Sequence, residues 1–316
     1  MIEWLRPAVS VLLLLATMWV SPNCFSQTPN LSGLKVERGI MFAGAGQRSL
    51  KLDLYRPDNG SSNMPVVVLI YGGAWVMRNL WMETPRAEWL ARHDYAVAVI
   101  DYRLSSESLF PAQIYDCKAA VRWIRANAAK YGLDAAHIGA LGDSSGGHLA
   151  SLLGVTGHGS ALEGDEGDTN QPSQVQAVVD FFGPTDFLQA EAHSLPGSWI
   201  NHDSPSSPES LLIGGPVQKN PEKAELANPI RYVTQDAPPF FIAHGEQDLL
   251  VPCNQSELLF NALKKAGDNV TFYKIAGAGH ADRAFNSDMM RAAVLAFLDK
   301  YLKPHPASAH ETNARQ

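Results

Sequence analysis

Apolar residues along the chain fall into two kinds of run, and the two kinds alternate. Short continuous runs, such as residues 66–71 and 95–101, are typical of strands that are covered on both faces. Longer runs in which apolar positions recur at helical spacing, such as residues 112–131, predict amphipathic helices. Strands that alternate with helices in this way indicate a mostly parallel sheet with helices on both faces.

The same pattern predicts the individual elements. The first two predicted strands, residues 36–42 and 50–55, are expected to form a hairpin or to pair with each other. Gly132 is expected to end the long helix predicted over residues 112–131. The eight predicted strands span residues 36–42, 50–55, 66–71, 95–101, 137–141, 175–182, 239–243 and 270–275, and the predicted helices span 86–93, 112–131, 146–155, 255–266 and 289–302.

Two stretches interrupt this alternation. Residues 157–172 are rich in Gly, Asp and Glu, which is typical of a solvated loop. A calcium loop is the alternative, but it needs denser alternating oxygen ligands and a closing Glu. Residues 186–236 are rich in Pro and Ser and separate two strands by more than an ordinary loop. We therefore expect this insertion to carry helices of its own, as a small cap over the sheet.

Both ends of the chain are expected to lie outside the folded domain. Residues 8–20 form an apolar run too short to span a bilayer comfortably, and the small residues Cys24 and Ser26 precede a cleavage point after residue 26. Residues 1–26 thus predict a signal peptide, a secreted or periplasmic protein and no stable membrane span after processing. An uncleaved anchor is the alternative. The domain then spans 27–303, and a disordered tail spans 304–316.

Composition and charge narrow the range of partners. The 316 residues are 46% hydrophobic and 18% charged, as in an ordinary globular domain, and the formal net charge of −7 argues against nucleic acid as a partner. Cleavage after residue 26 would leave Cys117 and Cys253, which either pair or stay free, because sequence does not place their Cα atoms. No Cys or His cluster suggests a metal, and we expect no cofactor.

The segment Gly-Asp-Ser-Ser-Gly, which begins at Gly142, follows an apolar run and leads directly into a helix. This is the setting of a nucleophile elbow, a turn so tight that side chains collide two positions before and after its central residue. Gly142 and Gly146 meet that requirement around Ser144, whereas a turn centred on Ser145 would place Asp143 at one of these positions. Ser144 is therefore the predicted nucleophile, at a helix N-terminus that favours a developing oxyanion.

A second glycine-rich segment, Tyr-Gly-Gly-Ala-Trp, follows the third predicted strand. Two consecutive glycines let the backbone bend back and present N–H groups to a bound molecule. We predict an oxyanion hole formed by the N–H groups of Gly73 and Ala74 with that of Ser145. A plain turn at the end of a strand is the alternative.

The last two strands are each followed by a loop with an ionisable residue, at the sheet edge where ligands gather. The first loop contains Asp248, the predicted acid of a triad, with Glu246 and the more distant Asp186 as rivals. The second loop is Ala-Gly-Ala-Gly-His, whose glycines leave His280 free to reach the serine. His148 is expected to point away along the helix that follows the elbow.

These residues together predict a serine hydrolase mechanism. His280 would take the proton of Ser144 as the hydroxyl attacks an acyl carbon, and Asp248 would fix the tautomer of the imidazole. Water would then release the acyl-enzyme, again with His280 as base. His244, in the strand before the Asp248 loop, is expected to pack at the strand end and not to react.

Several segments resemble a known group of enzymes: YGGAW, DYRLSSESLFPAQIYDCKAAVRWIRANAAKYGLD, GDSSGGHLA, VQAVVDFFGPTDF, NPI and HGEQDLLVPCNQSELL. Over residues 34–302 the chain is similar to exported bacterial esterases related to the bifunctional feruloyl and acetyl-xylan esterases, in the hormone-sensitive-lipase-like branch of the α/β-hydrolases. The resemblance implies that fold and a serine esterase acting on acetyl or feruloyl esters of plant polysaccharide. Its motifs agree with Ser144, Asp248 and His280, in the chain order of α/β-hydrolases.

One residue departs from the pattern of the family. Tyr71 stands where the family usually has a His that braces the oxyanion loop.

Several functions other than a polysaccharide esterase remain open. A lipase or short-chain carboxylesterase of broad specificity is the main alternative. A peptidase or amidase is disfavoured because such enzymes usually carry an additional propeller domain, for which this sequence has no room. An inactive binding protein is disfavoured because the predicted triad and its glycines are intact. Trp75, Phe187 and Trp199 are candidates to stack on a substrate, with at least two expected to be packing residues.

Overall fold

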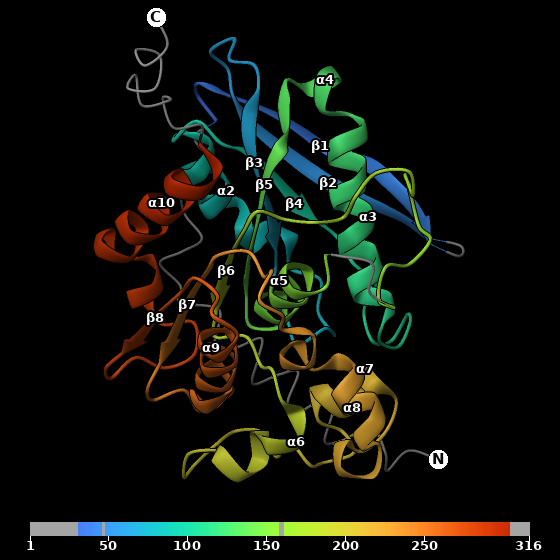
Figure 1. Ribbon diagram of the computed structural model, residues 1–316, viewed down its shortest axis with the longest axis vertical. Coiled ribbons are helices and arrows are strands. Elements are labelled where there is room, and N and C mark those ends of the chain that lie inside the picture. Colours follow the sequence, from blue (N-terminus) through green and yellow to red (C-terminus); the bar gives the residue numbers. More distant parts are fainter. Residues whose placement is uncertain (1–30, 46–47, 158–160, 304–316) are drawn as a thin grey trace, which may run out of the picture.

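One eight-stranded sheet runs through the computed structural model, which describes residues 31–45, 48–157 and 161–303 (Figure 1). The strand order is β1-β2-β4-β3-β5-β6-β7-β8. The β1–β2 and β2–β4 pairs are antiparallel and the remaining pairs are parallel. The predicted mostly parallel sheet and the pairing of the first two strands are thus confirmed. The strands are β1 (Leu34–Ala45), β2 (Arg48–Pro57), β3 (Met64–Ile70), β4 (Ala96–Ile100), β5 (Leu133–Asp143), β6 (Ala177–Phe181), β7 (Phe240–Gly245) and β8 (Val270–Ile275).

Helices cover both faces of the sheet. Successive residues of a strand point to opposite faces, so a strand that is apolar throughout packs against helices on each side. The main helices are α2 (Thr84–Ala91), α3 (Ala112–Ala126), α4 (Ala128–Tyr131), α5 (Ser145–Val155), α9 (Asn254–Ala266) and α10 (Asp288–Leu302), with the 3-10 helices η2 (Leu80–Glu83) and η6 (Arg283–Asn286). In β3, Val66, Val68 and Ile70 pack in one core with α3, α5 and α9, whereas Val67 and Leu69 pack in the other core with α2 and α10.

The helix predicted over residues 112–131 is divided in two. It is interrupted at Asn127, whose backbone leaves the helical conformation and whose side-chain amide donates to the carbonyl of Trp123 at 2.9 Å. A short polar side chain that bonds to nearby backbone competes with the helical hydrogen-bond ladder, which accounts for the break. Gly132 ends α4 in a left-handed conformation with φ of 67°, as the sequence indicated.

The acidic stretch after α5 forms no helix or strand in its described part, residues 161–172. Its glutamates contact cations of the α3 region. Glu163 accepts a hydrogen bond at 2.7 Å from the buried ammonium of Lys118, and Glu166 accepts one at 2.7 Å from Arg103. The carboxylates therefore compensate buried positive charge. Within the described ranges, no group of three or more His, Cys, Asp or Glu residues is arranged to hold a metal ion.

The insertion between β6 and β7 folds into short helices that gather at one end of the sheet (Figure 1). They are α6 (Phe187–Ala190), η3 (Glu191–His193), α7 (Pro208–Ile213), η4 (Val217–Lys219), α8 (Pro221–Ala227) and η5 (Pro229–Tyr232). None of the described helices is long and apolar enough to cross a membrane. Cys117 and Cys253 are both free thiols. The predicted signal peptide and the tail after residue 303 lie outside the described residues.

Candidate active site

Ser144 lies in a sharp turn between the end of β5 and the start of α5. Its backbone has φ of 53° and ψ of −122°, outside the regions that residues with side chains usually occupy. A Cβ atom on Gly142 would lie 2.2 Å from the carbonyl oxygen of Gly146, and one on Gly146 would lie 2.0 Å from that of Ile70. Both positions are therefore closed to any residue other than glycine unless the backbone moves.

Gly146→Ala tests how strictly this turn depends on glycine. The added methyl group would collide with backbone atoms of β3, so we expect a loss of about 3 kcal/mol in the free energy of unfolding, near the upper end for overpacking. Thermal denaturation followed by circular dichroism should show the Tm fall by about 6 to 12 °C. The control is Gly44→Ala in β1, where nothing lies within 4 Å of the added Cβ. An equal Tm for both variants would contradict the packing argument.

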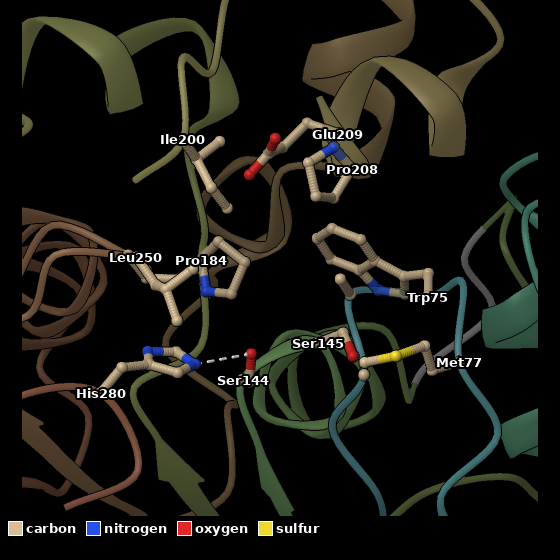
Figure 2. A pocket seen from close by; sticks show the side chains of 13 residues that line it. Trp75, Met77, Ser144, Ser145, Pro184, Ile200, Pro208, Glu209, Leu250 and His280 are labelled. Carbon is tan, nitrogen blue, oxygen red and sulfur yellow. Dashed lines mark hydrogen bonds between the residues drawn. The ribbon is translucent and has the colours of Figure 1, made fainter. Parts of the chain in front are cut away.

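His280 connects Ser144 to Asp248. The Ser144 hydroxyl lies 3.0 Å from Nε2 of His280, and Nδ1 of His280 donates to Oδ2 of Asp248 at 2.7 Å (Figure 2). Because the carboxylate only accepts, Nδ1 carries a proton, and Nε2 is free to accept from the serine. Asp248 comes from the loop after β7 and His280 from the loop after β8, so the structure brings together the three residues that the sequence analysis selected.

The rival acids are engaged elsewhere. Glu246 faces Lys274 at 3.8 Å, and the side chain of Asp186 caps α6 by accepting from the N–H of Leu188. Asp248 is instead held by the N–H groups of Leu250 and Val251, which donate to its Oδ1 at 2.8 and 2.9 Å.

The charge of Asp248 is stabilised strongly. Burial alone would raise its pKa, but the nearby charge of His280 and hydrogen bonds from His244 and His280 hold the pKa of this carboxyl well below its usual range. The group therefore stays ionised and remains able to accept from His280 as the pH falls.

His244 contributes to this arrangement in a way that the sequence analysis missed. Its ring is buried at the end of β7, as predicted, but Nε2 lies 2.9 Å from the carbonyl of Val251 and 3.2 Å from Oδ2 of Asp248. Since that carbonyl only accepts, Nε2 carries the proton, and Nδ1 accepts from the Ser256 hydroxyl at 2.7 Å. His244 thus helps to orient Asp248 through Oδ2, the same oxygen that accepts from His280. The only signal in the sequence is its position four residues before Asp248.

The loop after β3 bends sharply beside Ser144. Gly73, Ala74 and Trp75 all have positive φ, at 143°, 55° and 57°. Gly73 and Ala74 line the same pocket as Ser144, together with Ser145. As the first residue of α5, Ser145 has an N–H group with no acceptor inside the helix. The three predicted oxyanion donors therefore lie around one pocket.

Tyr71 and Arg78 brace the two ends of this loop through one carboxylate. The Tyr71 hydroxyl donates to Oδ1 of Asp101 at 3.1 Å, and Nε of Arg78 donates to the same oxygen at 2.9 Å. The ring of Tyr71 stacks on Tyr102 with centroids 4.4 Å apart, and the Tyr102 hydroxyl donates to the Tyr71 carbonyl at 3.1 Å. A tyrosine can therefore hold this loop at the position where the resemblance implied a histidine.

The pocket above Ser144 is largely apolar. Of the three aromatic candidates, Trp75 lines it but is almost fully buried, Phe187 is buried, and Trp199 is 40% exposed. The pocket is lined by Gly73, Ala74, Trp75, Met77, Ser144, Ser145, Pro184, Ile200, Pro208, Glu209, Leu250, Val251 and His280 (Figure 2).

His148 points away from Ser144, as expected. Its Nε2 lies 2.7 Å from the carbonyl of Ala227, and burial lowers its pKa to about 4.

A mostly parallel eight-stranded sheet with a serine at the turn from β5 to α5 defines the chain as an α/β-hydrolase. The chain belongs to the BD-FAE family, whose model matches residues 52–263. This result agrees with the feruloyl and acetyl-xylan esterase resemblance seen in the motifs.

Individual relatives are esterases. A truncated carbohydrate esterase from gut microbiota is 33% identical, with a TM-score of 0.79 over 87% of this chain and 99% of that one. A bifunctional GH43-CE protein of Bacteroides eggerthii is 38% identical, with a TM-score of 0.75 over 84% of this chain and 38% of that one. Esterase LipQ of Mycobacterium tuberculosis is 33% identical over 263 residues, which is 81% of this chain. The chain spans 60% of the length of LipQ.

Proposed function

We propose that this protein is a secreted serine carboxylic-ester hydrolase that acts on acetyl or feruloyl esters of plant polysaccharide. The observation that carries the proposal is the continuous hydrogen-bond chain from Ser144 through His280 to Asp248, at the base of an apolar pocket. Nucleophile, base and orienting acid within hydrogen-bond reach of one another are the arrangement that activates a serine hydroxyl.

In this proposal the reaction has two halves. Oγ of Ser144 attacks the ester carbon while Nε2 of His280 takes its proton, and the protonated imidazole then gives that proton to the departing alcohol. Water attacks the acyl-enzyme with His280 again as base, which releases the acid and restores Ser144. Asp248 stabilises the positive imidazole in each half.

The negative oxygen of each tetrahedral intermediate would be met by the N–H groups of Gly73, Ala74 and Ser145. A loop braced at Tyr71 and Arg78 holds two of these donors in place before substrate arrives, so little reorganisation is needed during the reaction. One oxyanion donor contributes about 3 to 4 kcal/mol to transition-state stabilisation in comparable sites.

The substrate class rests on family membership and on the carbohydrate esterases among the structural neighbours. Secretion is proposed from the apolar segment at residues 8–20 and suits a polymeric substrate outside the cell. A second candidate is a broad-specificity lipase or short-chain carboxylesterase, which the apolar pocket and the likeness to LipQ favour.

Hydrolysis of three substrates separates these candidates. We expect the protein to release acetate from acetylated xylan or ferulate from methyl ferulate with a kcat/KM at least tenfold above that for tributyrin. A preference for tributyrin would favour the broad-specificity enzyme, and no turnover of any ester, 4-nitrophenyl acetate included, would contradict the esterase proposal. Processing is tested separately, by N-terminal sequencing of the protein recovered from the medium or periplasm.

A further inference from the structure

The wall of the pocket contains one buried carboxylate with an unused acceptor. Glu209, in α7, lines the pocket, and its side chain is only 4% exposed. Oε1 accepts from Nδ1 of His202 at 2.9 Å, whereas Oε2 accepts no hydrogen bond from the described residues. The neighbouring Ser207 hydroxyl is close enough to lower the pKa of Glu209, but its hydrogen bond is donated to Ser210 at 3.0 Å. A buried acceptor without a partner costs free energy, so its retention in a pocket wall points to a ligand that supplies the donor.

The position of Glu209 in the pocket indicates that the missing hydrogen-bond donor would come from a bound substrate. Figure 2 shows the carboxylate at the end of the pocket opposite Ser144 and His280, extending from α7 toward Ile200. The neighbouring wall is formed by apolar side chains, including Ile200, Pro208 and Trp75. In such surroundings a single polar contact has a large effect on which molecules bind, because an analogue that lacks the donor leaves the buried oxygen unpaired.

The charge of the carboxylate is already compensated inside the protein. Burial would raise the pKa of Glu209, but the charge of His202 lowers it, and the charge of Glu209 in turn raises the pKa of His202 although burial lowers it. Both pKa shifts therefore favour the charged forms of this buried pair. Of the other acids close to His202, Glu191 accepts from its backbone N–H, and Asp203 accepts from Gln218. Because the charge of Glu209 is already paired with His202, the oxygen that lacks a protein donor suits a neutral donor better than a second cation.

We propose that Oε2 of Glu209 accepts a hydrogen bond from a hydroxyl group of the ester substrate and makes the enzyme selective for hydroxylated esters. The inference rests on the proposed esterase function and assigns a specificity residue to its pocket. The hydroxyl belongs to the acyl group or to the alcohol, and these two sources are distinguished by substrate pairs that differ by hydroxyl groups on one side of the ester only.

The test compares such pairs in the wild-type enzyme. Methyl 4-hydroxycinnamate against methyl cinnamate varies the acyl group, and 2,3-dihydroxypropyl acetate against propyl acetate varies the alcohol. We expect kcat/KM to favour the hydroxylated member of one pair by about 10- to 100-fold, the range for a hydrogen bond to a charged group. Equal values within both pairs would overturn the inference while leaving the esterase function intact. Absence of turnover with all four esters would instead overturn the proposed function.

Glu209→Gln then assigns the preference to this residue. Because an amide is a weaker acceptor than a carboxylate, we expect the preference to shrink to within about threefold, mainly through slower turnover of the hydroxylated ester. The matched control is Glu222→Gln, the same change at an exposed position of α8 in the same insertion, which should keep the wild-type preference. A Glu209→Gln enzyme that folds and keeps the full preference would refute the assignment. If it does not fold, the wild-type comparison still decides whether selectivity exists, and preferential inhibition by free 4-hydroxycinnamate over cinnamate decides whether the pocket recognises an acyl hydroxyl.

Discussion

Replacing Ser144 by alanine is expected to lower kcat for 4-nitrophenyl acetate by about 10⁵- to 10⁶-fold, because no other group takes the place of the attacking hydroxyl. The residual rate would come from binding and from the oxyanion donors alone. KM should change little, since the hydroxyl contributes to the transition state more than to substrate binding. Initial rates at saturating substrate measure the effect, with enzyme purified under conditions that exclude other esterases.

Ser145→Ala is the matched comparison for this change. The Ser145 hydroxyl lies 3.4 Å from that of Tyr102, and its backbone N–H is unaffected by the substitution. We expect kcat to fall by less than about tenfold. If Ser145→Ala were as inactive as Ser144→Ala, or if Ser144→Ala kept wild-type turnover, the choice of nucleophile would be wrong.

Asp248→Asn is expected to have the second largest effect, a fall in kcat of about 10⁴-fold. An amide at this position no longer provides a negative charge for His280, and its N–H₂ group favours the tautomer with the proton on Nε2, where it cannot accept from Ser144. Because the pKa of Asp248 lies well below the usual range, the wild-type carboxylate is charged throughout the neutral and mildly acidic range. The defect of the variant should therefore persist across that range.

Glu246→Gln provides the control from the same loop. Glu246 is partly exposed and faces Lys274, so its substitution should leave kcat within about threefold of the wild type. The ratio of the kcat values of the two variants decides which acid orients His280. A larger defect in Glu246→Gln than in Asp248→Asn would reverse the assignment. Thermal denaturation of both proteins separates a catalytic defect from partial unfolding.

The features that could be predicted from sequence are those encoded within a few consecutive residues. The elbow depends on Gly142 and Gly146, which lie two positions either side of Ser144, and the periodic apolar runs fix the order of strands and helices. The loops that carry Asp248 and His280 follow directly from strand ends. In each case a local pattern and the parallel topology together place the residue at one edge of the sheet.

The contacts that sequence could not predict join residues far apart in the chain or depend on exact side-chain direction. Tyr71 and Asp101 are 30 residues apart. The pair of His202 and Glu209 lies in an insertion whose helices are too short for an apolar period to be recognised, so nothing marked it as part of a pocket. The second role of His244 was missed because burial and contact with Asp248 are equally compatible with its place at a strand end.

Ser144 and His280, the two side chains proposed to react, differ in how firmly the sheet holds them. Ser144 follows β5, which has neighbours on both sides, whereas His280 follows β8, one of the two edge strands, whose residues are all at least partly exposed. Outer strands with few buried contacts fray at lower cost than inner ones. If the proposed mechanism holds, heat inactivation would accordingly begin at this edge of the sheet, where the imidazole of His280 would lose its alignment with Ser144 while the rest of the molecule is still folded.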